Sequence, residues 1–313
     1  MKRLAIIVAC LPPVSALAQD FPTRPVRVLV GLAPGGGSDT VARIMSTRLS
    51  ETSGQTFVVD NRPGAGGAIA SEIVAKAAPD GHTLLLMTPT HVVTPNLRSN
   101  AGYDPIRDFV PLILATYTPY VMSVRTSVPA KTVKELIALA RTQNLTYASS
   151  GIGGANHLTA ELFQHMANVK MTHVPYKSGS QANAALIGGE VHVSFTAMGG
   201  LIPHIKAGRV RALGVTSSKR SAVAPDIPTI AESGVPGFEV VGWYGFGAPA
   251  RTPQSVTEKL NGMFNRALDE LKQRYAAVGN EIAGGRAAEF GAYLRREYEQ
   301  WARVIKISGA KAE

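Results

Sequence analysis

The chain has 313 residues, of which 45% are apolar and 17% charged, with 32 Lys and Arg against 22 Asp and Glu. This composition is typical of a globular protein with about two domains, and it argues against a disordered or fibrous chain. A net charge of +10 would suit nucleic acid or an acidic ligand, but only 6% of residues are aromatic and no long basic run occurs, so nucleic acid is not an expected partner.

Residues 1–18 predict a secretory signal peptide. Lys2 and Arg3 form a positive start, Leu4–Leu11 a short apolar core, and Ala16-Leu17-Ala18 a small-x-small cleavage site. The apolar core is too short to span a bilayer as an anchor. We therefore expect the chain to be exported.

Cys10 is the only cysteine and lies within this segment, where Ile7-Val8-Ala9-Cys10 faintly resembles a lipoprotein box. The exported chain would then contain no disulfide. Removing Lys2 and Arg3 leaves 30 basic and 22 acidic residues, a net charge of +8. No later segment reaches 18 uninterrupted apolar residues, so no membrane-spanning helix is expected.

From Val26 onward, short apolar runs alternate with loops and amphipathic stretches. The first series predicts strands at Val26–Leu32, Thr56–Val59 and Thr83–Met87 and helices at Thr40–Ser50 and Ile69–Ala77. The third strand is expected to end in a polar loop over residues 88–91. This alternation predicts parallel strands with crossover helices.

A second series of the same kind begins after Pro119. It predicts strands at Tyr120–Val124, Leu145–Ala148, Thr172–Pro175, Val191–Phe195 and Val210–Thr216, and helices at Val133–Thr142, Asn156–Met166, Gln181–Ile187 and Leu201–Lys206. A strand at Val240–Phe246 leads back, and helical spacing predicts two last helices over Val256–Leu271 and Phe290–Trp301. The fold class is therefore α/β with two lobes, residues 20–120 plus 244–313 and residues 121–243, and a ligand cleft between them.

A glycine-rich loop, Pro34-Gly35-Gly36-Gly37-Ser38, ends the first strand and opens a helix. Glycine lets the backbone approach a ligand, and a helix N-terminus favours an anion. Asp39 is expected to cap the helix, because an acid facing an anionic ligand would repel it. The loop does not match the dinucleotide-binding pattern, because Thr40 stands where a third glycine is needed. A purely structural strand-to-helix turn is the alternative.

Further candidate ligand contacts follow strands in both series and supply hydroxyls, backbone N–H groups and one cation. They are Thr88, Thr90 and His91 in the first series, and Ser149, Ser150, Gly151, Gly153, His157, Tyr176, Lys177, Ser178 and Thr196 in the second. Asn61 and Arg62 could also reach a carboxylate, or could belong to a structural loop. Lys177 is the one charge here that would oppose an anion directly, although a solvated loop lysine is common.

Metal binding and catalysis find little support in the sequence. His157, Glu161 and His165 share one helix face but span two turns, and the His-Glu-x-x-His pattern is absent, so no metal or cofactor is expected. No Gly-x-Ser-x-Gly elbow occurs, and the exported chain has no cysteine nucleophile. An enzyme is therefore not expected.

Several motifs resemble one family. They are Val26–Arg43, Val58–Gly81, Tyr147–Phe163, His173–Gly189, Ile205–Arg220 and Pro225–Glu232 followed by Pro236-Gly237-Phe238-Glu239. Together they resemble the substrate-binding proteins of tripartite tricarboxylate transporters, the Bug family of periplasmic receptors. The resemblance covers nearly the whole chain after the signal peptide.

This resemblance implies a Venus-flytrap fold that closes on a small carboxylate, held by loop backbone, hydroxyls and ordered water. It also implies a periplasmic receptor that hands its ligand to a membrane permease, and we expect a monomer. A sensor of the same fold that signals to a membrane partner stays open, as does a secreted enzyme acting on a carboxylate. Many relatives carry Asp-Asn after the phenylalanine at position 195, whereas this chain has Thr196-Ala197. The departure favours a plain mono- or dicarboxylate over an amino acid.

Overall fold

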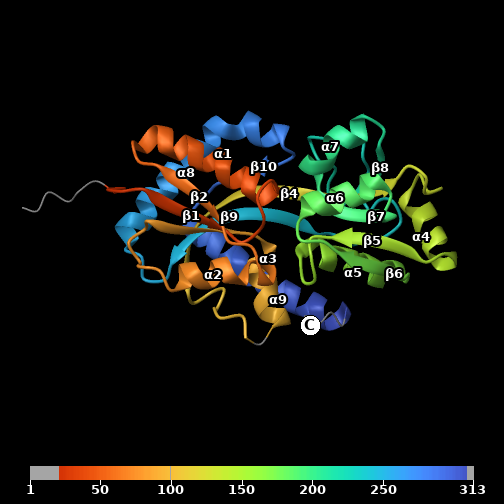
Figure 1. Ribbon diagram of the computed structural model, residues 1–313, viewed down its shortest axis with the longest axis horizontal. Helices are drawn as coiled ribbons and strands as arrows, with labels where there is room; N and C mark the ends of the chain where they lie inside the picture. The colour runs from red at the N-terminus through yellow and green to blue at the C-terminus, as the bar shows by residue number, and fades with distance from the viewer. Residues whose placement is uncertain (1–20, 99, 309–313) are drawn as a thin grey trace, which may run out of the picture.

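The computed structural model describes residues 21–98 and 100–308, which form an elongated α/β molecule with two lobes (Figure 1). The predicted signal peptide, including Cys10, lies outside the described residues. Within the described ranges, no helix combines the length and the apolar composition needed to cross a membrane.

Three parallel strands form the outer half of the first lobe. Strand β1 (Val26–Val30) lies between β2 (Phe57–Asn61) and β3 (Thr83–Met87). Helix α1 (Gly37–Ser53) connects β1 to β2, and the 3-10 turn η1 (Ala65–Gly67) and helix α2 (Ala68–Ala75) connect β2 to β3. Helix α3 (Pro89–Leu97) follows β3. In Figure 1, α1 lies above these strands and α2 below them. Because both faces are covered, β1 and β3 are apolar except at Arg27 and Thr83, as expected of buried parallel strands.

Helix α3 begins where we expected a polar loop. Thr88 is its N-cap and Pro89 lies in the first turn. Proline is tolerated there because a backbone N–H in the first turn has no helical partner to bond. The sequence does not predict this helix, because Val92, Val93 and Thr94 are β-branched and Pro95 lies inside it, and both features disfavour helices. The prediction of a loop over residues 88–91 was wrong.

Two long antiparallel strands join the lobes. Strand β4 (Phe109–Arg125) pairs with β9 (Val241–Pro249) as far as Pro119, and from Tyr120 onward it pairs with second-lobe strands. The order of the continuous sheet is β2-β1-β3-β9-β4-β7-β5-β6. The expected strand at 120–124 is thus only the end of a 17-residue strand. Pro111 and Pro119 obscure its first part, because proline is unusual in a strand interior.

The second lobe repeats the strand–helix alternation. Strands β6 (Met171–Pro175) and β7 (Val193–Ala197) both pair in parallel with β5 (Leu145–Ser149), and β8 (Val210–Val215) runs antiparallel to β4. Its helices are α4 (Val133–Thr142), α5 (Ala155–Ala167), α6 (Gly179–Gly188) and α7 (Met198–Lys206). The parallel part of this lobe agrees with the sequence prediction.

The C-terminal segment packs back on the molecule. Helix α8 (Gln254–Ala277) contacts α1 and β4, and the short strand β10 (Glu281–Ile282) pairs with β4. Helix α9 (Ala287–Ser308) contacts α3, β4 and α5. It therefore touches the first lobe, the connecting strand and the second lobe (Figure 1).

Candidate functional site

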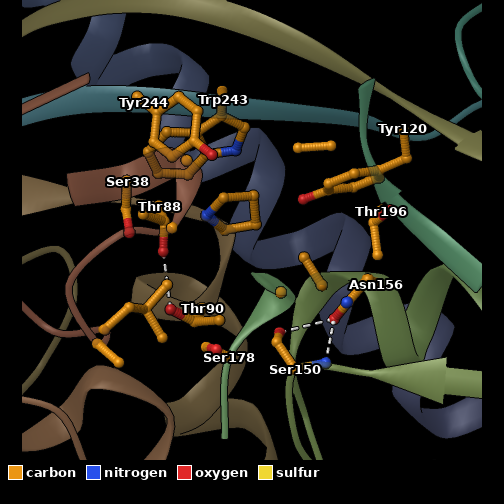
Figure 2. A pocket seen from close by; sticks show the side chains of 18 residues that line it. Ser38, Thr88, Thr90, Tyr120, Ser150, Asn156, Ser178, Thr196, Trp243 and Tyr244 are labelled. Atoms are coloured by element: carbon orange, nitrogen blue, oxygen red, sulfur yellow. Dashed lines mark hydrogen bonds between the residues drawn. The ribbon is translucent and has the colours of Figure 1, made fainter. Parts of the chain in front are cut away.

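A cavity of about 100 Å³ lies between the lobes, near the carboxyl ends of strands from both (Figure 2). Its lining comprises Leu32, Ala33, Gly36, Gly37, Ser38, Thr88, Pro89, Thr90, Tyr120, Ser150, Ala155, Asn156, Ser178, Gly179, Thr196, Ala197, Trp243 and Tyr244. A buried water needs about 10–15 Å³. The volume therefore has room for a small organic molecule.

Five helices begin at this cavity. Residues at the starts of α1, α3, α5, α6 and α7 all belong to its lining, namely Gly36 and Gly37, Thr88 and Pro89, Ala155, Ser178 and Gly179, and Ala197. The first turn of a helix leaves backbone N–H groups without helical partners and carries a partial positive charge. Their convergence from both lobes gives the cavity a positive potential suited to an anion.

The side chains around the cavity are neutral. Its lining includes no Lys, Arg, Asp or Glu among the residues that the structure describes. Hydroxyls and one amide supply the polar groups: Thr88 Oγ1 lies 2.8 Å from Thr90 Oγ1, and Ser150 Oγ donates to Asn156 Oδ1 at 2.9 Å (Figure 2). An anion would thus meet hydrogen-bond donors without an opposing carboxylate.

Asp39, the acid nearest the glycine-rich loop, is turned away from the cavity. Its Oδ2 accepts hydrogen bonds from the Gly35 N–H (3.0 Å) and from Arg43 Nε (2.9 Å). Burial opposes its ionisation, but the hydrogen bonds from Arg43 and Gly35 outweigh this and lower its pKa. Gly36, and not Asp39 as we expected, is the N-cap of α1. The carboxylate instead lies in the first turn, where a negative charge stabilises the helix.

Three aromatic residues form a wall that sequence analysis did not assign to the site. Tyr120 comes from β4, and Trp243 and Tyr244 come from β9; in Figure 2, Tyr120 points across the cavity toward the side where the other two lie. Burial raises the pKa of Tyr244 to about 12 and that of Tyr120 further, so both hydroxyls stay protonated and can donate. Sequence analysis places these residues only in the expected strands at 120–124 and 240–246. The sequence carries no signal that β4 and β9 pair with each other and run past the cavity.

Eight of the seventeen candidate residues line the cavity, and they come from both lobes. They are Gly36, Gly37, Ser38, Thr88, Thr90, Ser150, Ser178 and Thr196. The glycine-rich loop and Ser150 of the facing lobe therefore share one cavity. Contact of these residues with a ligand stays a prediction.

The other first-lobe candidates do not reach the cavity. Pro34 and Gly35 lie in the loop between Ala33 and Gly36, which line the cavity, but are not themselves part of its lining. His91 lies in the interior, where its ring nitrogens pair with Ser71 Oγ (3.3 Å) and the Pro105 carbonyl (3.1 Å). Burial lowers the pKa of His91 to about 4, so it is a neutral core residue. Asn61 binds the Leu32 carbonyl and Arg62 binds Asp60, so both serve the loop itself.

Several second-lobe candidates that lie outside the cavity stabilise the loop between β5 and α5, which contains the lining residue Ser150. Ser149 Oγ lies 2.6 Å from His173 Nε2, and His157 Nδ1 accepts the Gly153 N–H at 3.3 Å. Gly151 and Gly153 have φ of +122° and +75°, which favour glycine. A Cβ at Gly153 would lie 2.4 Å from Leu97 Cδ1, so this loop approaches the first lobe closely.

Tyr176 and Lys177 point elsewhere. The Tyr176 hydroxyl donates to Glu190 at 3.0 Å, and Lys177 is exposed. Neither lines the cavity. In this structure Lys177 is therefore not placed to face an anion in the cavity as we expected. The helix N-termini supply the positive potential there instead.

The helix face considered for metal binding holds a contact of a different kind. His157 Nε2 lies 4.0 Å from Glu161 Oε1, and that carboxylate accepts the Tyr147 hydroxyl at 2.5 Å. Among the described residues, no group of three or more His, Cys, Asp or Glu side chains could hold a metal ion.

A family model described as "Tripartite tricarboxylate transporter family receptor" matches residues 41–309. The chain belongs to this family. Among solved structures, the receptor is similar to a protein from R. palustris titled "Rpa4515 with adipate", with a TM-score of 0.90 and 38% identity over 93% of this chain and 99% of that one.

Two further solved structures agree with this assignment. The periplasmic binding protein BugD matches with a TM-score of 0.86 and 34% identity over 94% of this chain and 100% of that one. MatC from Rhodopseudomonas palustris, solved with bound malate, matches with a TM-score of 0.85 and 33% identity over 91% of this chain and 100% of that one. The predicted resemblance to the Bug family and the two-lobed fold class are thus confirmed.

Proposed function

We propose that the receptor captures a small carboxylate in the periplasm, in the cavity between the lobes, and delivers it to the membrane permease of a tripartite tricarboxylate-type transporter. The observation that carries this proposal is the convergence of five helix N-termini and neutral hydroxyls on a cavity whose lining, within residues 21–98 and 100–308, includes no charged side chain. Similar proteins solved with adipate and malate support the class of ligand, and the similar periplasmic protein BugD supports the location.

Binding without chemistry follows from the same lining. The cavity offers donors for an anion, but no histidine or carboxylate that could act as a general base is among the described residues that line it. We therefore propose a receptor that holds its ligand unchanged. We also propose, on the family resemblance alone, that it acts as a monomer.

Closure of the two lobes would complete the site. We assign residues 20–120 and 244–313 to one lobe and residues 121–243 to the other, since β4 changes partners after Pro119. A ligand that contacts helix N-termini of both lobes stabilises the closed form by its difference in affinity for the two forms. The motion would occur in β4 and β9, the two strands that connect the lobes.

The test is to replace a glycine of the lining by a residue whose side chain occupies the cavity. At Gly36, φ is −84° and a Cβ would lie 3.7 Å from its nearest neighbour, Ala33 O, so a side chain is accommodated there. In Gly36→Leu we expect affinity for the carboxylate to fall about fivefold to more than a hundredfold, because overpacking costs about 1–3 kcal/mol. Calorimetric titration with organic acids that raise the melting temperature of the unaltered receptor measures the loss.

Gly188→Leu is the matched control. Gly188 is exposed at the end of α6, lies outside the cavity lining, and a Cβ there would meet nothing within 4 Å. It should bind like the unaltered receptor. If the folded Gly36→Leu variant kept its affinity, the ligand would have to bind outside this cavity. If the bound acid were converted to a product, the protein would be an enzyme and the proposed receptor function would be wrong.

A further inference from the structure

A series of four hydrogen bonds holds the glycine-rich loop from outside the cavity. The Gly35 N–H donates to Asp39 Oδ2 at 3.0 Å, and Arg43 Nε donates to the same oxygen at 2.9 Å. Arg43 Nη2 donates to Asn61 Oδ1 at 3.2 Å, and Asn61 Nδ2 donates to the Leu32 carbonyl at 3.0 Å. The series therefore begins and ends on the backbone of one loop.

The three side chains of this network lie outside the cavity lining. Asp39 and Arg43 lie one turn apart on α1, and Asn61 ends β2. The loop that they hold contributes to the lining Leu32, Ala33, Gly36 and Gly37. Any effect of the network on binding must therefore pass through the loop or through the charges of its members.

Arg43 is the central member of the network. Asp39 is only 4% exposed, and its second oxygen, Oδ1, has no hydrogen-bond partner among the described residues. Without Arg43 this buried carboxylate would keep fewer donors, so it would turn toward water and release the Gly35 N–H. The guanidinium donates from nitrogens held in one plane, which lets it serve Asp39 and Asn61 at the same time.

The conformation of the loop explains why it needs to be held. Gly35 has a φ of +80°, in the left-handed region. At Gly37, a Cβ would lie 2.5 Å from the Tyr244 hydroxyl, so the loop lies directly against β9. A glycine-rich loop that is free before binding must lose conformational freedom when it binds, and holding it beforehand removes this cost.

We propose that Asp39, Arg43 and Asn61 are positioning residues, which hold the backbone of residues 32–37 in the conformation that accepts an anion before the anion arrives. The affinity of the cavity for a carboxylate then depends on side chains that do not touch it. A loop that adopts the binding conformation for about a tenth of the time binds about ten times more weakly. This inference rests on the proposed function, because it takes a carboxylate as the ligand of the cavity.

Asn61→Ala tests the proposal without changing any charge. Asn61 is partly exposed, and the variant removes both the donor to Leu32 and the acceptor of Arg43. We expect the affinity to fall about tenfold. Calorimetric titration with succinate, glutarate, adipate, citrate and benzoate measures the affinity of the unaltered receptor and of the variant.

Amide hydrogen exchange gives a second measurement on the same variant. Exchange of the Gly35 N–H in the ligand-free protein should be faster in Asn61→Ala than in the unaltered receptor, and an acid that binds should slow it again. A side chain that only stabilised the fold would lower the free energy of unfolding and leave the affinity of the folded variant unchanged.

Arg43→Lys separates position from charge. The ammonium keeps the charge but lacks the planar group that serves two partners. This variant should lose about as much affinity as Asn61→Ala, and the double variant should lose little more than either, because both changes break one network. If Arg43 acted only through its charge, Arg43→Lys would bind like the unaltered receptor, and the proposal would be wrong.

Arg48→Lys is the matched control. Arg48 lies on the same helix, pairs with Glu51 and Glu270, and is not part of the cavity lining. Its replacement should change neither the affinity nor the exchange of the Gly35 N–H. Unchanged affinity in Asn61→Ala, or an equal loss in Arg48→Lys, would overturn this inference alone. If the unaltered receptor bound none of the five acids, the proposed function would fail, and this inference with it.

Discussion

Trp243 and Trp301 are the two tryptophans of the chain, and both donate their indole N–H to the same oxygen, Glu297 Oε2, at 2.7 and 3.1 Å. Trp243 is fully buried and lines the cavity, whereas Trp301 lies on α9 outside it. A single carboxylate thus fixes one aromatic residue of the site and anchors the helix behind it.

This arrangement predicts a fluorescence signal for binding. A ligand in the cavity alters the surroundings of Trp243 directly, so the unaltered receptor and Trp301→Phe should both change emission on titration with a bound carboxylate. Trp243→Phe should lose the change and still bind by calorimetry. A signal that survives Trp243→Phe but disappears in Trp301→Phe would contradict the position of Trp243 in the site.

At the same scale, sequence reasoning succeeded where a local pattern determines geometry. Gly36, Gly37 and Ser38 follow an apolar strand and open an amphipathic helix, so their place at a strand end could be read from the chain. His91 and Tyr120 show the limit. Which way a polar side chain turns at a strand end, and which aromatic of a distant strand meets the loop, depends on packing between segments far apart in sequence.

At the scale of elements, α9 is the part that ties the lobes together behind the site. Phe290 packs so closely on β9 that a Cβ at Gly245 would lie 2.2 Å from its ring, and Glu297 holds Trp243 of the same strand. Burial raises the pKa of Glu297 above its ordinary value of 4.5, against the opposing effect of the hydrogen bonds from Trp243 and Trp301. The folded receptor therefore holds this proton more tightly than the unfolded chain.

A pH dependence of stability follows. The contribution of Glu297 is fully present below pH 4.5 and is lost as the pH rises through its folded pKa. Gln at this position keeps an acceptor oxygen and does not ionise. The free energy of unfolding of Glu297→Gln, relative to the unaltered receptor, should therefore rise above pH 4.5 by about 1.4 kcal/mol for each pH unit up to the folded pKa. Urea denaturation at several pH values measures it.

Glu289→Gln on the same helix provides a control of opposite sign. Hydrogen bonds from the Arg286 backbone and side chain lower the pKa of Glu289, so its contribution is present above its ordinary value of 4.5 and lost as the pH falls through the folded pKa. This variant should become relatively less stable as the pH rises. The same pH trend in both variants would show that burial of Glu297 does not control the effect.

At the scale of the whole molecule, two strands and one helix connect lobes that meet around the cavity. The strand–helix alternation in each lobe could be predicted because hydrophobic period and loop glycines are local. The path of β4 could not, since its first part carries Pro111 and Pro119 and its partners change from β9 to β7 and β8. Pairing between strands far apart in the sequence leaves little local trace in a single chain.

Closure predicts a change in size on binding. A carboxylate that bridges helix starts of both lobes should draw them together, so small-angle scattering should give a smaller radius of gyration with saturating ligand than without it. The Gly36→Leu variant, mixed with the same acid, should keep the larger value. An identical radius with and without ligand, under conditions where calorimetry shows full occupancy, would mean that the cavity is already formed before binding.

The neutral lining of the cavity also has a consequence for the surroundings in which the receptor works. Among the described residues that line it, the only ionisable side chains are two tyrosines, and burial raises the pKa of both, to about 12 for Tyr244. Capturing an anion there therefore neither takes up nor releases a proton from the lining near neutrality. The affinity of this cavity for a carboxylate should then depend on pH only through the ionisation of the ligand itself, at about pH 4–5. A change in the pH outside the cell should leave the affinity unchanged until the ligand becomes protonated and neutral.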